Sequence, residues 1–509
     1  MKKIIALLIT ASLLIFVACE LNQPAAPQLN ITPQQLVLSK MVAVGASYTA
    51  GFQSGGLVDD FQKMSFPYLI AKQMGRVDDF QMGWLAKPGF GSADLTTGKA
   101  FGPLKWNGTS IVPGDEVPGG IDGIELLLFN GGNAELARPY DNLGIPGADL
   151  NDLLTTTEFD AVTGTGNPFF NLTLRNPNFG GTTELDQAIL LQPSLVLLNL
   201  PGGNDYLGAA LSGTAVEGVT LTSQADFRTR FTKVIERLTG ETKAVIVTTN
   251  LPYPSLLPYV NILDNFIYKS IPALGITQPV PVVFDSQFQP VLFDSTIGLY
   301  LPLLADEGLL TGGSPIAHVL LPFLNEYQAS GLGVPDSAAL VGMGLPPATA
   351  QALVQGMIAA GLTPSGVAIP GNLTLTANEE ATINTAVDGY NDILKDVISG
   401  KTITQVDLVT TITNIVNNPG TSGVTAFFVL LDPNTTMFSL DGVHPNDAGY
   451  AIIGNEFIKE INKVLNVNIP LLNISDFTGQ YSGTSPEKMV PGAVKQVREI
   501  FVKDKSILK

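Results

Sequence analysis

The chain has 509 residues, of which 45% are hydrophobic and 14% are charged, and it contains 52 glycines. This length and balance exclude a peptide, a small disulfide-stabilised protein and a disordered or coiled-coil chain, and they predict a large packed core with many turns. The formal net charge is −18, from 27 Lys and Arg against 45 Asp and Glu. Because binding to nucleic-acid phosphates needs a basic surface, the composition argues against nucleic acid as a partner.

The N-terminus has the pattern of an export signal. Lys2 and Lys3 precede an apolar run from Ile4 to Val17, which is too short to span a bilayer comfortably, and Ala18-Cys19 closes it. This pattern resembles the lipobox of bacterial lipoproteins. The resemblance implies that residues 1–18 are removed and that Cys19 carries a lipid anchor; an ordinary signal peptide is the alternative.

Residues 19–36, rich in Pro, Asn and Gln, are predicted to form a flexible tether after this signal. Cys19 is the only cysteine, which excludes disulfide bonds within the chain. Glu20 is not the Asp that retains some lipoproteins in the inner membrane, so we expect an anchor in the outer membrane of a Gram-negative bacterium. No other segment of 18 or more apolar residues is free of Pro and Gly, so no transmembrane helix is predicted.

Strands and helices are predicted to alternate along the rest of the chain. The predicted strands are short aliphatic runs at 40–44, 195–200, 244–248 and 403–408. The predicted helices are 66–74, a helix with Phe227, Phe231, Val234, Ile235 and Leu238 on one face that stops at Gly240, a helix that starts with a Thr376/Glu379 capping box, and a helix running through Tyr450 to Leu465. Such alternation predicts an α/β fold with a mainly parallel sheet.

The segment 256–372 differs from the rest in having few charges. Eight of its 117 residues are charged, Lys269 is its only cation, and 337–378 carry no charge at all. Its best helix candidate is 347–360. We interpret it as an insertion that forms either a second small domain with its own core or a lid or lipid-facing groove. The last residues, 476–509, are interpreted as a surface appendage with a short helix at 494–502.

Only two histidines occur, His318 and His444, so histidine-dependent chemistry is easy to locate. His444 precedes Pro445 and a helical pattern, which predicts that Pro445 lies in the first helical turn and that the imidazole stands at the start of the helix. The positive end of a helix favours the neutral imidazole that a general base requires. Asp441, three residues earlier, is placed to bind the other ring nitrogen.

Three further segments place serine, asparagine or glycine in turns. Ser47 follows the first predicted strand in Gly45-Ala46-Ser47-Tyr48-Thr49-Ala50-Gly51, and Asn204 follows the second in Gly202-Gly203-Asn204-Asp205. Gly147 lies in Asn142-Leu143-Gly144-Ile145-Pro146-Gly147-Ala148-Asp149, where its backbone N–H could face a site. Sites of α/β proteins form at the carboxyl edge of the sheet, so these residues are candidates for one site. Taken singly, each is better explained as a turn or a helix cap.

The order of these four motifs resembles the SGNH, or GDSL-type, hydrolase family. The resemblance covers residues 37–255 and 373–470, interrupted by the insertion, and the second part of the domain is expected to end at residue 475. It implies a flavodoxin-like three-layer α/β sandwich. Ala46 departs from the family's G-D-S-x-[ST]-x-G motif, because the family has Asp there; the departure keeps the hydroxyl of Ser47 and removes a local polar contact.

The resemblance implies the chemistry of a serine hydrolase. Ser47 would be the nucleophile, His444 the base and Asp441 the residue that orients it, while the N–H groups of Ser47 and Gly147 and the side-chain amide of Asn204 would bind the oxyanion. No metal or cofactor is predicted, since the sequence has no ligand cluster, phosphate loop or dinucleotide motif. His318 has no acid or Cys close in sequence, and we expect a structural role for it in preference to that of a ligand.

The expected function is that of a membrane-anchored serine esterase or lipase, and the apolar insertion favours acyl-chain esters as its substrates. Deacetylation of a polysaccharide is the alternative within the same chemistry. An alternative of another class is an inactive hydrolase-like lipoprotein that binds a lipid or an envelope partner. Turnover of p-nitrophenyl esters distinguishes these hypotheses, because a binding protein would cleave none of them.

Overall fold

The computed structural model describes residues 36–106, 111–159, 167–264, 268–271, 276–281, 283–284, 303–306, 314, 316–342, 344–359, 361–417 and 436–478. The predicted leader, nearly all of the tether, the predicted helix at 494–502 and most of the C-terminal appendage lie outside the described residues.

A parallel sheet of four strands forms the centre of the described structure. Its spatial order is β1-β6-β7-β14, and every neighbouring pair is parallel. The bounds are β1 (Met41–Gly45), β6 (Leu195–Asn199), β7 (Val245–Thr249) and β14 (Ile403–Val406). All four strands lie within two residues of their predicted positions, which confirms the prediction of an α/β fold with a parallel sheet.

A further backbone segment, 141–145, runs along the free edge of β1. The N–H of Ala43 donates to the carbonyl of Asp141 at 2.8 Å, and the N–H of Leu143 donates to the carbonyl of Ala43 at 2.9 Å. This segment was not predicted as part of the sheet. It carries the chain straight to Gly147, beside the carboxyl end of β1.

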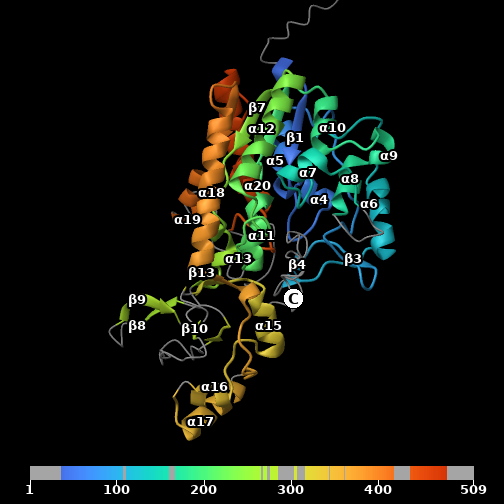
Figure 1. The fold of residues 1–509 in the computed structure, drawn as a ribbon. Helices are drawn as coiled ribbons and strands as arrows, with labels where there is room; N and C mark the ends of the chain where they lie inside the picture. The colour runs from blue at the N-terminus through green and yellow to red at the C-terminus, as the bar shows by residue number, and fades with distance from the viewer. Residues whose placement is uncertain are drawn as a thin grey trace, which may run out of the picture.

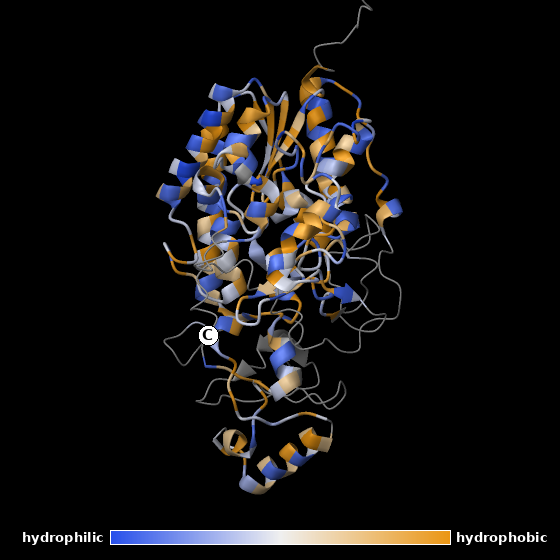
Figure 2. Cartoon of the chain, turned by 90° about the vertical axis from the view of Figure 1, so that its right-hand side faces the viewer, coloured by the Kyte–Doolittle hydropathy of each residue, from blue (hydrophilic) through white to orange (hydrophobic). Residues whose placement is uncertain are grey.

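Helices cover both faces of the sheet (Figure 1). One face packs on α7 (Leu150–Thr155), α10 (Glu184–Leu190), α11 (Asn204–Ser212), α12 (Gln224–Glu241) and α18 (Ala377–Ile398), and the other on α5 (Phe66–Gln73) and α20 (Asp447–Leu465). Side chains of β1 alternate between these layers, because Val42 and Val44 pack on the first and Met41 and Ala43 on the second. Figure 2 shows the strands as hydrophobic ribbons with helices of mixed hydropathy on either side.

Shorter elements connect these layers around the β1 end of the sheet. The short helices are α3 (Ser47–Ala50), α4 (Asp59–Gln62), α6 (Ile124–Asn130), α8 (Phe169–Leu174) and α9 (Asn176–Phe179), and the small antiparallel pairs are β2 (Ser92–Asp94) with β3 (Lys99–Phe101) and β4 (Lys105–Trp106) with β5 (Ile111–Val112). The helix α19 (Leu408–Asn417) follows β14 and packs through Ile412 and Ile415 on the α18 side of the sheet.

Two predicted helix ends are wrong by a short distance. The helix α12 continues through Gly240 to Glu241. Pro445 is not in the first turn of α20, because Asn446 is the N-cap and its side chain accepts the N–H of Gly449 at 3.0 Å. The predicted capping box of α18 is confirmed: the N–H of Glu379 donates to Thr376 Oγ1, and the Glu379 carboxylate accepts the N–H of Thr376.

The described parts of the insertion lie toward and beyond the lower end of the sheet in Figure 1, coloured from yellow-green to orange. They comprise α13 (Pro258–Asn261), β8 (Tyr268–Ile271), β9 (Ile276–Pro281), β10 (Val283–Phe284), β11 (Leu303–Leu304), β12 (Ile316–Val319), α15 (Phe323–Ser330), α16 (Ser337–Gly342) and α17 (Pro347–Ala359). Two small apolar clusters form within them, one around Phe323 and one around Leu340. The strand β12 pairs antiparallel with β13 (Thr374–Thr376), which leads directly into α18.

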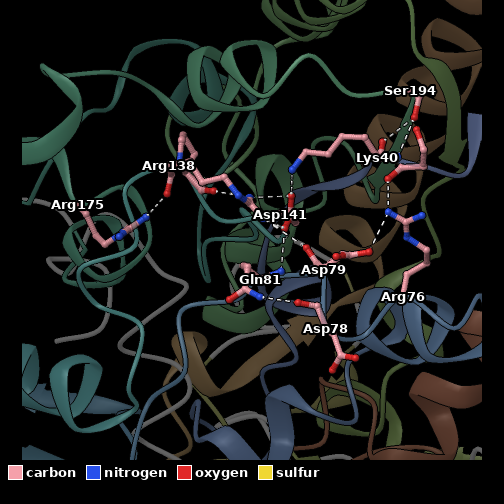
Figure 3. A network of polar contacts seen from close by, with 11 residues as sticks. Lys40, Arg76, Asp78, Asp79, Gln81, Arg138, Asp141, Arg175 and Ser194 are labelled. Carbon is pink, nitrogen blue, oxygen red and sulfur yellow. Dashed lines mark hydrogen bonds and ion pairs between the residues drawn. The ribbon is translucent and has the colours of Figure 1, made fainter. Parts of the chain in front are cut away.

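A buried carboxylate organises the opposite end of the sheet, where β1 begins (Figure 3). Asp141 is 1% exposed. Its carboxylate accepts a two-point contact from the Arg138 guanidinium at 2.8 and 3.0 Å, the ammonium of Lys40 and the N–H of Gln81. Because the backbone of Asp141 also pairs with β1, this residue fixes the edge segment 141–145 to the sheet.

Replacement of Asp141 with alanine is expected to lower the free energy of unfolding by about 3 kcal/mol, since it leaves two cations and a backbone N–H without their acceptor. Urea unfolding followed by circular dichroism measures this. Asp79→Ala is the matched control, because Asp79 is 70% exposed in its pair with Arg76 and its removal should cost less than about 1 kcal/mol. Equal effects of the two substitutions would contradict the prediction.

Candidate active site

The first part of the site is the turn after β1. Gly45 has a φ of +149°, and a side-chain Cβ there would lie 2.5 Å from Thr49 Oγ1 and 2.7 Å from the carbonyl oxygen of Asn199. The turn therefore needs glycine. It places Ser47 at the first position of α3, where 4% of the Ser47 surface is exposed. Within the described residues, the N–H of Ser47 makes no hydrogen bond.

A glutamate that the sequence analysis did not single out supports this turn. Glu184, the first residue of α10, is fully buried, and its Oε1 accepts the N–H of Gly45 at 2.8 Å. Burial raises the pKa of Glu184 well above its ordinary value, although the hydrogen bond from Gly45 acts in the opposite direction. No local pattern marks Glu184 as special, because its partner lies 139 residues earlier in the chain.

The second part is the end of the edge segment. The Asn142 side chain ties this segment to the serine turn, since its Nδ2 donates to the Thr49 carbonyl at 2.7 Å and its Oδ1 accepts the N–H of Gly144. Gly147 has a φ of +80°, in the left-handed region that favours glycine. Its N–H makes no hydrogen bond within the described part of the chain.

The third part is the turn after β6. Asn204 begins α11, and its Nδ2 donates to the carbonyl of Ala148 at 2.7 Å, next to Gly147. A side-chain amide has two N–H bonds, so this contact fixes the orientation of the amide and leaves one N–H for another acceptor. The neighbouring Asp205 is buried and joins the same segments, because its carboxylate accepts the N–H of Leu150 and the hydroxyl of Thr222.

The fourth part is the Asp441–His444 pair. Both side chains are fully buried, and Asp441 Oδ2 lies 2.8 Å from His444 Nδ1. The carboxylate also accepts the N–H groups of Gly55, Val443 and His444 at 2.7 to 2.8 Å. Burial acts to raise the pKa of Asp441, but the attraction of His444 and these hydrogen bonds outweigh it, and the pKa is lowered. The carboxylate therefore stays ionised and fixes the orientation of the imidazole.

A small pocket connects these parts. It has a volume of about 40 Å³, and its walls include Ser47, Asn204 and Val443, the residue before His444. Tyr48, the residue after Ser47, donates its hydroxyl to the Val443 carbonyl at 2.6 Å, and its ring centre lies 5.6 Å from that of His444. The structure thus brings three of the predicted motifs to one pocket, with Gly147 joined to it through the contact between Asn204 and Ala148.

The stem of the insertion, residues 258–264 and 316–321, holds the loop that carries His444. The N–H of Tyr259, in α13, donates to the Gly442 carbonyl at 2.9 Å, and the Tyr259 carbonyl accepts the N–H of Leu321. Gly442 has a φ of +72° and packs directly against Tyr259 and Leu321. This part of the insertion is therefore a support for the Asp441–His444 loop, a role that the sequence analysis did not foresee.

His318 lies away from this pocket and between two carboxylates. Its Nδ1 is 2.8 Å from Asp264 Oδ1 and its Nε2 is 3.4 Å from Glu380 Oε1, so the ring joins the insertion stem to α18. Burial acts to lower the pKa of His318, but the two carboxylates outweigh it and raise the pKa to about 9. The geometry is that of a charged structural histidine whose acidic partners come from distant segments.

This charge predicts a loss of stability in alkali. The folded-state pKa of about 9 lies above the ordinary value of 6.5, so the stabilisation is complete below pH 6.5 and disappears as the pH rises through about 9. The shift corresponds to about 3 kcal/mol. We expect the unfolding midpoint of wild type to fall between pH 7 and 10 more steeply than that of His318→Gln; parallel curves for the two proteins would contradict this.

Among the described residues, no three or more His, Cys, Asp or Glu side chains are grouped to hold a metal ion. Within the same residues, no helix combines the length and the apolar character needed to cross a bilayer. Comparison with known proteins adds no relative: no family model, no curated protein and no solved structure matches this chain.

Proposed function

We propose that the protein is a serine esterase that cleaves carboxylic esters through an acyl-enzyme intermediate. The observation that carries the proposal is the buried Asp441–His444 pair, whose loop meets Ser47 at a pocket that also has Asn204 in its wall. With the edge segment 141–145 counted as the second strand, the sheet order becomes 2-1-3-4-5, which is the flavodoxin-like order. This order supports the SGNH-type assignment that the four motifs suggest.

In the proposed reaction, Ser47 Oγ attacks the ester carbonyl carbon while His444 accepts the serine proton. The negative charge that develops on the carbonyl oxygen is bound by the N–H groups of Ser47 and Gly147 and by the second N–H of the Asn204 amide. His444 then returns the proton to the leaving alcohol, and the acyl group remains on Ser47. Water, deprotonated by His444, attacks this acyl-enzyme and releases the acid, and the proton returns to Ser47.

The size of the pocket favours short acyl groups. The pocket is small, with a volume of about 40 Å³. Apolar side chains such as Leu200, Leu207 and Leu257 line much of it. A long acyl chain would have to extend beyond this pocket, whereas an acetyl group fits close to it, so the O-acetylesterase alternative gains support from the same observation.

The proposal is tested by labelling the purified mature protein with a fluorophosphonate and mapping the modified peptide, together with turnover of p-nitrophenyl esters from acetate to palmitate. We expect a label on Ser47 that is lost in His444→Ala, and turnover that falls steeply with acyl length. Absence of both the label and all turnover would reject the esterase and favour the binding-protein alternative.

Asn204→Ala is expected to lower kcat by on the order of 10²–10³, because it removes one donor to the oxyanion. KM should change little, since the donor acts mainly on the charge that develops in the transition state. Steady-state kinetics on p-nitrophenyl acetate measure both constants. Asn151→Ala is the control, because the Asn151 amide donates to Thr155 Oγ1 at 3.1 Å within α7. A wild-type kcat in Asn204→Ala would remove Asn204 from the site.

We further propose that a lipid on Cys19 anchors the protein in the outer membrane. The support is the sequence pattern that ends at Ala18-Cys19. Metabolic labelling with a radioactive fatty acid, compared between wild type and Cys19→Ala, tests the anchor, and separation of inner and outer membranes tests its place. An unlabelled wild-type protein would favour the ordinary signal peptide.

A further inference from the structure

Asn199, the last residue of β6, has no role in the reaction described above, and its side chain has no hydrogen-bond partner in the described structure. It is 1% exposed and lies in the wall of the Ser47 pocket. Neither its Oδ1 nor its Nδ2 has a hydrogen-bond partner among the described residues. A buried amide without partners costs about 1–3 kcal/mol, so a structural role does not account for it.

The next residue carries a second unfavourable feature. Leu200 has a φ of +42°, a left-handed conformation that is rare for a side chain of this size, and it also lines the pocket. The conformation is held by the hydrogen bond from the Leu200 N–H to Thr249 Oγ1 at 2.7 Å. Two costly features at adjacent residues of one pocket wall are the pattern expected where binding, and not stability, selects the structure.

The other polar side chains in the described pocket wall either have hydrogen-bond partners or take part in the proposed reaction. The hydroxyl of Tyr206 donates to the Pro252 carbonyl at 2.7 Å, and that of Tyr253 donates to the carboxylate of Asp388. Ser47 and Asn204 belong to the proposed reaction. Asn199 is thus the polar side chain of this wall that is available to a bound molecule.

We propose that Asn199 is a specificity-determining residue that binds a hydroxyl group on a short substituent of the ester. The inference rests on the proposed esterase function. An amide presents one acceptor and an N–H donor side by side, and a hydroxyl group matches both. The small pocket favours a substituent of few atoms, and the mainly apolar wall around Asn199 lowers the local dielectric, which strengthens this hydrogen bond.

Two matched substrate pairs test the proposal and distinguish the two ends of the ester. p-Nitrophenyl 3-hydroxybutyrate against p-nitrophenyl butyrate places the hydroxyl on the acyl side, and 2-hydroxyethyl butyrate against ethyl butyrate places it on the alcohol side. In wild type, we expect kcat/KM to be about 10-fold higher for the hydroxylated member of one pair. In Asn199→Leu, which is similar in size, that ratio should fall to about 1.

Thr248→Val is the matched control. Thr248 is a buried residue of the neighbouring strand whose Oγ1 also has no partner among the described residues, and it does not line the pocket. Both variants should unfold about 1–3 °C above wild type, because each removes an unpaired buried polar group. Only Asn199→Leu should change the substrate ratio; if it does not fold, Asn199→Ala takes its place.

The inference is overturned if wild type shows no preference in either pair, or if Asn199→Leu keeps the wild-type ratio. Ser47-dependent turnover of the plain esters in that case would leave the esterase proposal standing and reject the role of Asn199 alone. Absence of turnover on all four substrates, with no label on Ser47, would reject the esterase and the inference with it.

Discussion

Ser47→Ala is expected to lower kcat for p-nitrophenyl acetate by on the order of 10⁴–10⁶, because Ser47 is the only Ser, Thr or Cys among the described residues of the pocket wall. The substitution removes one oxygen from a residue that is 4% exposed. The turn around it is held by the Glu184 carboxylate, which accepts the N–H of Gly45, and by the Asn142 side chain, which donates to the Thr49 carbonyl. The unfolding midpoint should therefore stay within about 2 °C of wild type. Initial rates and thermal unfolding of the same preparation measure both.

The control for this experiment is Ser475→Ala, a serine in the short 3₁₀ helix Ile474–Phe477. It should retain full turnover and full fluorophosphonate labelling. Turnover by Ser47→Ala within about 10-fold of wild type would show that another nucleophile, or water activated directly by His444, does the chemistry.

Asp441→Asn is expected to lower kcat by on the order of 10⁴ while KM changes little. The wild-type carboxylate accepts hydrogen bonds from three backbone N–H groups and faces His444 Nδ1. An amide placed there must turn its NH₂ group toward some of these donors. The imidazole then loses the acceptor that holds the proton on Nδ1, and Nε2 is no longer kept free to act as the base.

Asp447→Asn is the matched control for this variant, since Asp447 is a half-buried carboxylate a short distance along the same segment. Burial raises the pKa of Asp447 to about 6, and its carboxylate accepts a hydrogen bond from Gln53 Nε2 at 2.9 Å. We expect less than a 10-fold effect on kcat. If both substitutions reduce kcat to the same extent, the loss comes from damage to the loop, and Asp441 has no special role in orienting the base.

The central sheet could be predicted because a strand buried on both faces needs a run of aliphatic residues, and 195–200 and 244–248 have one. The edge segment 141–145 has no such run. Gly144 and the proline that follows the segment, Pro146, favour a turn, and the segment joins the sheet through backbone hydrogen bonds with β1 that leave no trace in the side-chain pattern. Pro445 was predicted to lie in the first turn of α20 but precedes its N-cap, Asn446. The preference of proline for the first turn is weaker than the effect of a side-chain cap.

The sequence by itself determined the parts of the site that lie close together in the chain. Asp441 and His444 are three residues apart, so their pairing follows from local geometry, and each candidate loop directly follows a predictable strand or precedes a predictable helix. The long-range contacts that hold these parts together were decided by the tertiary structure alone. Glu184 meets Gly45 across 139 residues, Gly55 meets Asp441 across 386, and Tyr48 meets Val443 across 395. Local patterns arise from steric and hydrogen-bond preferences within a few residues, whereas such contacts depend on how the strands are ordered in the sheet and on which loops that order brings to one edge.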